Sequence, residues 1–170
     1  KPMTRLLLRA ALALTLVPAS ASAQSLDVPV RLMLFGEATF TETERAIADG
    51  FSLGQVVAHM NASLSPKLLV FVEGTLTPTG AAPTPTLERL IVRYDFRDWL
   101  KISGGRYHTP VSWWNTAFHH GSWLQPSIAR PQMIRFGTPL VPIHFLGLLA
   151  EGSAHTGPLI VAYEAGVGNG

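Results

Sequence analysis

Apolar and polar side chains alternate with a period of two over most of the chain. The clearest example runs from Leu87 to Arg97, where apolar or aromatic residues at positions 90, 92, 94 and 96 alternate with mostly charged ones. A period of two is typical of β-strands, whose successive side chains point to opposite faces. The pattern predicts strands over residues 28–40, 56–64, 67–77, 87–97, 99–107, 140–150 and 159–167.

The predicted connections differ in length in a regular way. Long ones cover residues 41–51, 78–85 and 108–139, short ones cover 65–66 and 97–98, and 151–157 is intermediate. Alternate connections of an up-and-down sheet lie at opposite ends, and outer-membrane barrels place long loops at one end and tight turns at the other. The fold class that we predict is all-β, an antiparallel up-and-down transmembrane β-barrel, present here as a partial barrel of about seven strands.

Composition decides which face of the predicted sheet meets water. A soluble barrel has the same alternation, with an apolar lumen. Here only 14% of residues are charged, against about 25% in typical soluble domains, and the polar positions are rich in Ser, Asn, Thr, His and Arg. This composition favours a wet lumen and a lipid-facing exterior. The alternative is a soluble periplasmic β-barrel that binds a ligand through its Trp- and His-rich loop.

The first 23 residues have the features of a secretory signal peptide. Arg5 and Arg9 give a basic start, residues 10–17 are an apolar run, and residues 21–23 read Ala-Ser-Ala, a cleavage pattern. The alternative, a transmembrane helix, needs a run of about 20 apolar residues. We therefore expect a signal peptide at 1–23 and an outer-membrane domain at 24–170.

Removal of the signal peptide changes the charge of the protein. The remaining chain has ten of the 13 Lys and Arg residues and all 11 acidic residues, so the basic pI is due to the signal peptide. We therefore expect no nucleic-acid partner. The chain has no cysteine, which excludes disulfides and thiolate metal sites.

Basic residues gather in the second half of the chain. Three of them, Arg89, Arg93 and Arg97, fall on one face of one predicted strand. An arginine facing lipid near the bilayer midplane costs about 2–4 kcal/mol, so we expect these side chains in the lumen, where they favour anions. The alternative is that they pair with Glu73, Asp95 or other acids of the wall. The predicted pore-lining residues are Arg89, Arg93, Arg97, Lys101, Arg106, Arg130 and Arg135.

The segment over residues 108–139 breaks the alternation and concentrates aromatic residues. An exposed loop with this many apolar side chains would form a costly patch in water, so we expect it to fold inward and narrow the pore. The predicted constriction residues are Trp113, Trp114, Asn115, His119, His120 and Trp123.

Enzyme chemistry finds little support in the sequence. Adjacent residues such as His119 and His120 point to opposite faces of a strand, and no acidic residue or cysteine lies within ten positions of the pair. The loop serines, of which Ser112 is the first, lack the G-x-S-x-G pattern of a nucleophile elbow. We therefore expect no catalytic residue, metal site or cofactor. A His-dependent metalloenzyme is the least favoured hypothesis.

Two stretches of the chain carry a resemblance. GRYHTPVSWWN at 105–115 and HHGSWLQPSIARP at 119–131 resemble a segment of phosphate-selective outer-membrane porins of the O and P type. The resemblance implies a sixteen-stranded trimeric barrel with anion-selective pores lined by arginine and lysine. It places a matching set at a strand end and in the following loop: Arg106, Thr109, Pro110, Trp114, Asn115, Arg130 and Pro131.

The expected role follows from this resemblance and the strand pattern. We expect an outer-membrane porin that passes small anionic solutes, is surrounded by outer-membrane lipid and assembles as a homotrimer. About seven strands are fewer than the eight of the smallest single-chain barrels, and the edges of an open sheet in lipid would lack partners. The sequence is therefore expected to be the N-terminal fragment of a longer porin.

Overall fold

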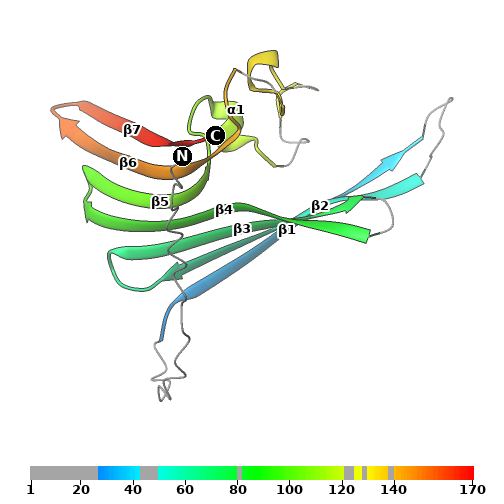
Figure 1. The fold of residues 1–170 in the computed structure, drawn as a ribbon, viewed down its shortest axis with the longest axis horizontal. Coiled ribbons are helices and arrows are strands. Elements are labelled where there is room, and N and C mark those ends of the chain that lie inside the picture. The colour runs from blue at the N-terminus through cyan, green and yellow to red at the C-terminus, as the bar shows by residue number, and fades with distance from the viewer. Residues whose placement is uncertain (1–26, 43–49, 80–81, 121–124, 128–129, 138–139) are drawn as a thin grey trace, which may run out of the picture.

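Seven β-strands form one antiparallel sheet in the computed structural model, which describes residues 27–42, 50–79, 82–120, 125–127, 130–137 and 140–170. Each strand pairs with the next one in the sequence (Figure 1). The strands are β1 (Val30–Thr41), β2 (Gly50–Ser63), β3 (Leu68–Thr79), β4 (Ala82–Arg97), β5 (Leu100–His108), β6 (His144–Thr156) and β7 (Leu159–Asn169). The prediction of an all-β, antiparallel, up-and-down arrangement of seven strands is confirmed. The predicted signal peptide at 1–23 lies outside the described residues.

The predicted long connection over residues 78–85 is wrong. β3 and β4 stay paired up to Thr79 and Ala82, and Pro78 lies opposite Pro83. Proline lacks a backbone N–H and is tolerated in a strand where that side has no partner. Pairing between β4 and β5 begins only at Leu90, so the prolines of β4 lie on an open edge. Figure 1 shows the result, in which β1 to β4 project past β5 to β7.

The predicted strand at 140–150 is displaced. β6 runs instead over His144–Thr156, and residues 151–156 pair with β7 although glycine and small residues are frequent there. The tight turn to β7 uses Gly157, whose φ of 60° is easily adopted only by glycine. The apolar run near residue 140 misled the sequence prediction because an apolar run without alternation does not define a strand's ends.

The pairing register divides the sheet into an apolar and a polar face. One row of mutually opposed residues crosses all seven strands and is entirely apolar: Val30, Ala62, Val70, Val92, Gly104, Leu148 and Val167. A row on the other face, across β4 to β7, is entirely charged: Asp95, Lys101, Glu151 and Glu164. Opposed residues of a sheet share one face. The larger side chains of the apolar row are nonetheless mostly exposed, and Val92 is 46% and Leu148 58% exposed, whereas the small Ala62 is buried.

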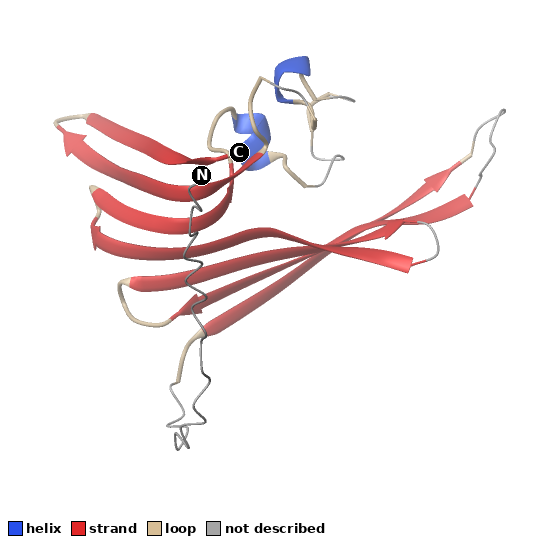
Figure 2. Cartoon of the chain, in the orientation of Figure 1, coloured by secondary structure: helices blue, strands red, loops and turns tan. Residues whose placement is uncertain are grey.

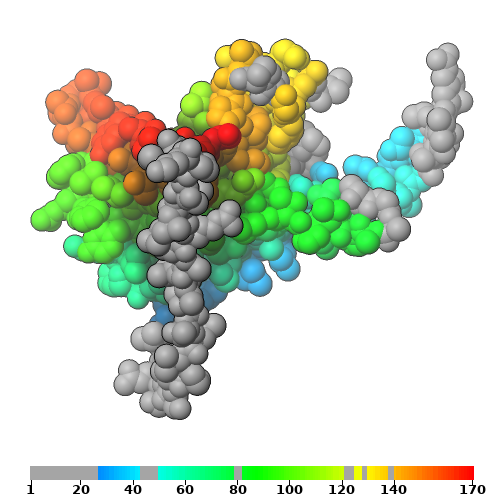
Figure 3. Space-filling model, in the orientation of Figure 1, coloured from blue at the N-terminus to red at the C-terminus, as the bar shows by residue number. Residues whose placement is uncertain are grey.

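The polar face is covered by the connection between β5 and β6. This connection contains the short helices α1 (Trp113–Ala117) and η2 (Gln132–Ile134). Figure 2 shows both helices on one side of the strands, and Figure 3 shows this segment standing over the sheet. The buried polar residues lie mostly beneath or within it: Glu73, Thr75, Glu88, Ser103, His108, Thr109, Asn115, His119 and Arg130. The burial pattern is thus the reverse of that in a water-soluble sheet.

Irregularities in the register redirect individual side chains. One lies between Glu73 and Gly74, where β4 has an additional residue, Glu88. A bulge of this kind lets one residue depart from strict alternation. Glu88 is therefore buried, although the nearby Leu87 and Leu90 are exposed.

Among the described residues, no helix has both the length and the apolar content needed to cross a membrane.

Gly105 provides a test of the β4–β5 register. Its φ is +147°, and a Cβ at this position would lie 1.9 Å from the carbonyl oxygen of Leu90. We expect Gly105→Ala to lower the free energy of unfolding by about 1–3 kcal/mol, because the two backbones must separate. Urea titration in detergent micelles measures the change. Gly74→Ala is the control, since the nearest atom there is 3.7 Å away. Equal losses in both variants would contradict the described register.

Candidate functional site

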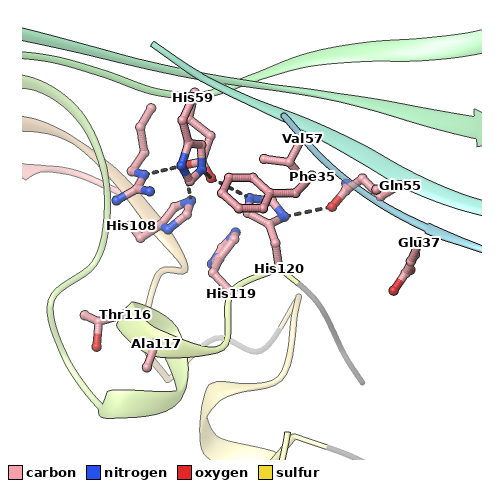
Figure 4. A pocket seen from close by; sticks show the side chains of 13 residues that line it. Phe35, Glu37, Gln55, Val57, His59, His108, Thr116, Ala117, His119 and His120 are labelled. Carbon is pink, nitrogen blue, oxygen red and sulfur yellow. Dashed lines mark hydrogen bonds and ion pairs between the residues drawn. The ribbon is translucent and has the colours of Figure 1, made fainter. Parts of the chain in front are cut away.

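A cavity of about 340 Å³ lies between the polar face of the sheet and the segment that connects β5 to β6. Strands β1 to β4 and the end of β5 form its wall, and residues 116–120 close it from the other side. In Figure 4 the imidazoles of His59, His108, His119 and His120 converge in this space. The described part of the connection therefore lies over the polar face, where a hydrogen bond from His120 to Gln55 holds it, while Trp113 of the same segment is 73% exposed.

Glu73 carries the most deeply buried carboxylate of the site. Its side chain is 1% exposed, and Arg89 donates a hydrogen bond from Nε to its Oε2. Nε2 of His59 lies 2.8 Å from Oε1. From the covering side, Nε2 of His120 lies 3.2 Å from Oε1 and Nε2 of His108 lies 3.6 Å from Oε2. A buried carboxylate is costly unless it is paired, so Glu73 holds the wall and the covering segment together.

Glu88 is the second buried carboxylate. Its Oε1 accepts a hydrogen bond of 3.2 Å from the Thr75 hydroxyl, and its Oε2 lies 3.0 Å from Nε2 of His144. Nε2 of His119 lies 4.0 Å from the same oxygen. The β-bulge brings this carboxylate to the polar face, so the strand end of β6 and the covering segment both approach it.

The imidazoles also pack against one another. The rings of His108 and His119 are stacked with centroids 3.4 Å apart and planes 16° apart. The centroids of His120 and His144 each lie 4.8 Å from that of His119. Burial, followed by the neighbouring His120, His144 and Arg130, lowers the pKa of His119 to about 3. His119 is therefore neutral at neutral pH, and one of its ring nitrogens carries a free lone pair.

Asn115 fixes the two ends of the covering segment. Its Nδ2 donates to the carbonyl oxygens of Thr109 at 2.7 Å and Ile143 at 2.9 Å. Its Oδ1 accepts from Nδ1 of His119 at 3.2 Å and from a terminal nitrogen of Arg130 at 3.3 Å. All four contacts use the amide in one orientation, which identifies Nδ1 of His119 as the protonated nitrogen.

A second group of charges lies further along the polar face. Nε of Arg93 is 2.8 Å from Asp95, and its terminal nitrogen is 3.3 Å from Glu151. Glu164 lies opposite Glu151 in the register and lines the same groove. Two of the arginines expected in the pore, Arg89 and Arg93, are therefore matched by carboxylates.

The other predicted pore-lining residues are dispersed. Lys101 lies opposite Asp95 and Glu151 on the polar face. Arg97 follows a register shift and is exposed at the end of β4. Arg106 lies opposite two apolar-face residues, and its Nε donates to the carbonyl oxygen of Glu88. In the covering segment, Arg130 is buried and Arg135 is exposed after η2.

The predicted constriction residues also have different positions. Asn115, His119 and His120 form the site itself. Trp113 is largely exposed, and Trp114 packs against Phe118 with ring centroids 5.4 Å apart. Trp123 lies outside the described residues.

Sequence reasoning named Glu73 only as an alternative partner of the arginines, which it is for Arg89, and missed Glu88 and the contacts of both acids with the histidines. Glu73 and Glu88 are far from His119 and His120 in the sequence, so a search near the histidine pair finds no acid. Pairing of β2 with β3 places His59 opposite Glu73, and the polar alternation of both strands contains that signal. The inward turn of Glu88 depends on a bulge, for which alternation gives no signal.

Comparisons with protein-family models, with curated proteins and with solved structures find no match to this chain.

Asn115→Ala tests whether this residue fixes the covering segment. The substitution leaves buried polar partners unsatisfied, including the Arg130 guanidinium, at about 1–3 kcal/mol for each such group. We expect faster hydrogen–deuterium exchange at Thr109, whose N–H donates to the carbonyl oxygen of Ile143 at 2.8 Å. Thr116→Ala is the control, because its exposed hydroxyl donates to the carbonyl oxygen of Trp113 within the same short helix. Unchanged exchange in Asn115→Ala would show that other contacts hold the segment.

Proposed function

We propose that this chain forms part of the wall of an outer-membrane porin, a passive channel for small solutes. The observation that carries the proposal is the polarity of the sheet, whose exposed face is apolar and whose covered face is charged. A sheet in water buries its apolar face, whereas a membrane barrel turns that face to lipid and lines its lumen with polar residues.

The lengths of the strands suit a bilayer. A strand that crosses a membrane at a tilt of about 45° needs roughly 9–11 residues. The shortest strand, β5, has 9 residues and the longest, β4, has 16. Each of the seven is therefore long enough to cross the hydrocarbon core.

Aromatic residues gather near the short turns. Tyr94 and Phe96 pack with ring centroids 4.7 Å apart, and the hydroxyl of Tyr163 donates to the carbonyl oxygen of Trp99 at 2.8 Å. All four side chains are exposed. Outer-membrane barrels carry aromatic girdles at the level of the lipid headgroups, so these residues support an interface at this end of the sheet.

The segment between β5 and β6 takes the role of a constriction in this proposal. Nδ1 of His120 donates to Oε1 of Gln55 at 2.7 Å, which fixes the segment to β2, three strands away from its start on β5. A loop held across the polar face narrows the lumen of a closed barrel. Closure requires strands beyond this sheet, because β1 and β7 each have one side unpaired in the described part of the chain.

The resemblance to phosphate-selective porins of the O and P type, carried by residues 105–115 and 119–131, supports the same class of protein. The trimer, the outer-membrane location and the lipid surroundings belong to this proposal. The anion preference expected from the sequence is not part of the proposed function. Carboxylates pair with Arg89 and Arg93, so this part of the wall has little excess positive charge.

Val92→Arg separates the porin from the rival soluble ligand-binding barrel. In a soluble protein this half-exposed surface site tolerates a charge with a change of about 0.5 kcal/mol or less. In a membrane it faces lipid, and the substitution costs about 2–4 kcal/mol near the midplane. We expect a loss of that size in unfolding titrations of the protein in lipid vesicles. The control is Asn61→Arg, on the opposite face, which should insert normally. A neutral effect of Val92→Arg would contradict the porin.

Charge substitutions around Arg93 test whether this face lines the channel. Arg93→Gln removes one positive charge from the ion-paired group, and Glu151→Gln removes one negative charge. Fixed charge in a narrow aqueous path enriches ions of opposite sign. In planar bilayers under a salt gradient we expect the first variant to shift the reversal potential toward cations and the second toward anions. Identical reversal potentials in the wild type and both variants would place the group outside the conducting path.

A further inference from the structure

The histidines at the boundary between the sheet and the covering segment have a property that the porin does not require. Nε2 of His108 is buried and forms no hydrogen bond with any described residue, although the side chain is only 4% exposed. A buried nitrogen without a partner is costly, so it calls for an explanation. The same holds for Nε2 of His120, which lies near Glu73 but forms no hydrogen bond to a described residue.

The proton positions sharpen this point. Nδ1 of His119 donates to Asn115, and Nδ1 of His120 donates to Gln55, so a neutral ring carries its lone pair on Nε2 in both residues. Those lone pairs lie near carboxylate oxygens, at 4.0 Å for His119 and Glu88 and at 3.2 Å for His120 and Glu73. A lone pair and a carboxylate oxygen repel each other unless a proton or another cation lies between them.

We infer that Glu88, His108, His119 and His120 bind a divalent transition-metal ion of the zinc class, which joins the covering segment to the wall of the sheet. One ligand atom from each of these residues lies within 4.8 Å of all the others. Zn–N bonds of about 2.0–2.1 Å in a tetrahedron correspond to ligand separations of about 3.3 Å. The four atoms therefore need to converge by at most about 1.5 Å.

The surroundings of the ligands fit this ion. Imidazole and carboxylate are the donors that zinc takes in the absence of cysteine. Asn115 and Gln55 each accept a hydrogen bond from Nδ1 of a ligand histidine, and outer hydrogen bonds of this kind orient metal-binding imidazoles. The two carboxylates are not equivalent. Glu73 is already matched by Arg89 and His59, whereas the contacts of the Glu88 carboxylate with described side chains are those with the Thr75 hydroxyl and with histidines.

Titration with Co²⁺, which reports its coordination through visible absorption, tests the inference on the purified protein in detergent after removal of metal with a chelator. We expect one equivalent to give the intense visible bands of a four-coordinate site and Zn²⁺ to abolish them. Zn²⁺ should also raise the unfolding temperature, because a ligand that binds only the folded state stabilises it. Neither readout depends on channel activity, so failure of the porin proposal leaves this test intact.

Three variants decide which residues bind the ion. His120→Gln and Glu88→Gln should each weaken Co²⁺ binding by more than about tenfold, since loss of even a supporting contact has that effect. His155→Gln is the matched control, because His155 is exposed near the β6–β7 turn. A folded wild-type protein that stays colourless at stoichiometric Co²⁺ overturns the inference. Binding that survives both site variants, or that is lost in His155→Gln, overturns it as well.

Discussion

Successive side chains of a β-strand point to opposite faces of the sheet. Most charged residues of β3 to β7 lie on the same face. The apolar row from Val30 to Val167 must then lie on the other face, without an element of the described chain to cover it. Water is a poor surrounding for so large an apolar surface, and lipid is a good one. The porin proposal follows from this single constraint together with the lengths of the strands.

The same constraint explains the covering segment. Charged residues gathered on one face need partners, and Glu73 has them both on the strands, in Arg89 and His59, and on the side of the covering segment. His108 and His120 approach Glu73 from the end of β5 and from the segment, and Asn115 holds the segment in the required position. The sheet and the covering segment are thus one electrostatic unit. A change in the charge of Glu73 or Glu88 is expected to alter the position of the segment.

The fold could be read from the sequence to a large extent, because alternation is a local property. The seven strands and their up-and-down order follow from it, and so does the contrast between Val92 and Arg93. The paired prolines of β3 and β4 could not be anticipated, since their tolerance depends on β5 ending short of them. The turn of Glu88 toward the polar face was also hidden, because a bulge depends on pairing between two strands.

The site was predictable only in part, for a different reason. The aromatic composition of residues 108–139 indicated a functional segment, and Asn115, His119 and His120 of this segment do form the centre of the site. The partners of these residues come from β2, β3 and β4, and the register that brings them together is a tertiary property. The arginines show the same limit, because the acids that match Arg93 include Glu151, which is distant in the sequence and adjacent in the sheet.

The central claim concerns which face of the sheet meets lipid, and the chain allows a direct measurement because it contains no cysteine. Single cysteines at positions 90 to 95, each carrying a nitroxide label, report access to oxygen from lipid and to a water-soluble nickel chelate in reconstituted vesicles. An apolar face in lipid predicts a period of two, with oxygen access highest at 90, 92 and 94 and chelate access highest at 91, 93 and 95. Highest chelate access at 90, 92 and 94 would contradict this orientation, because the apolar face would then meet water.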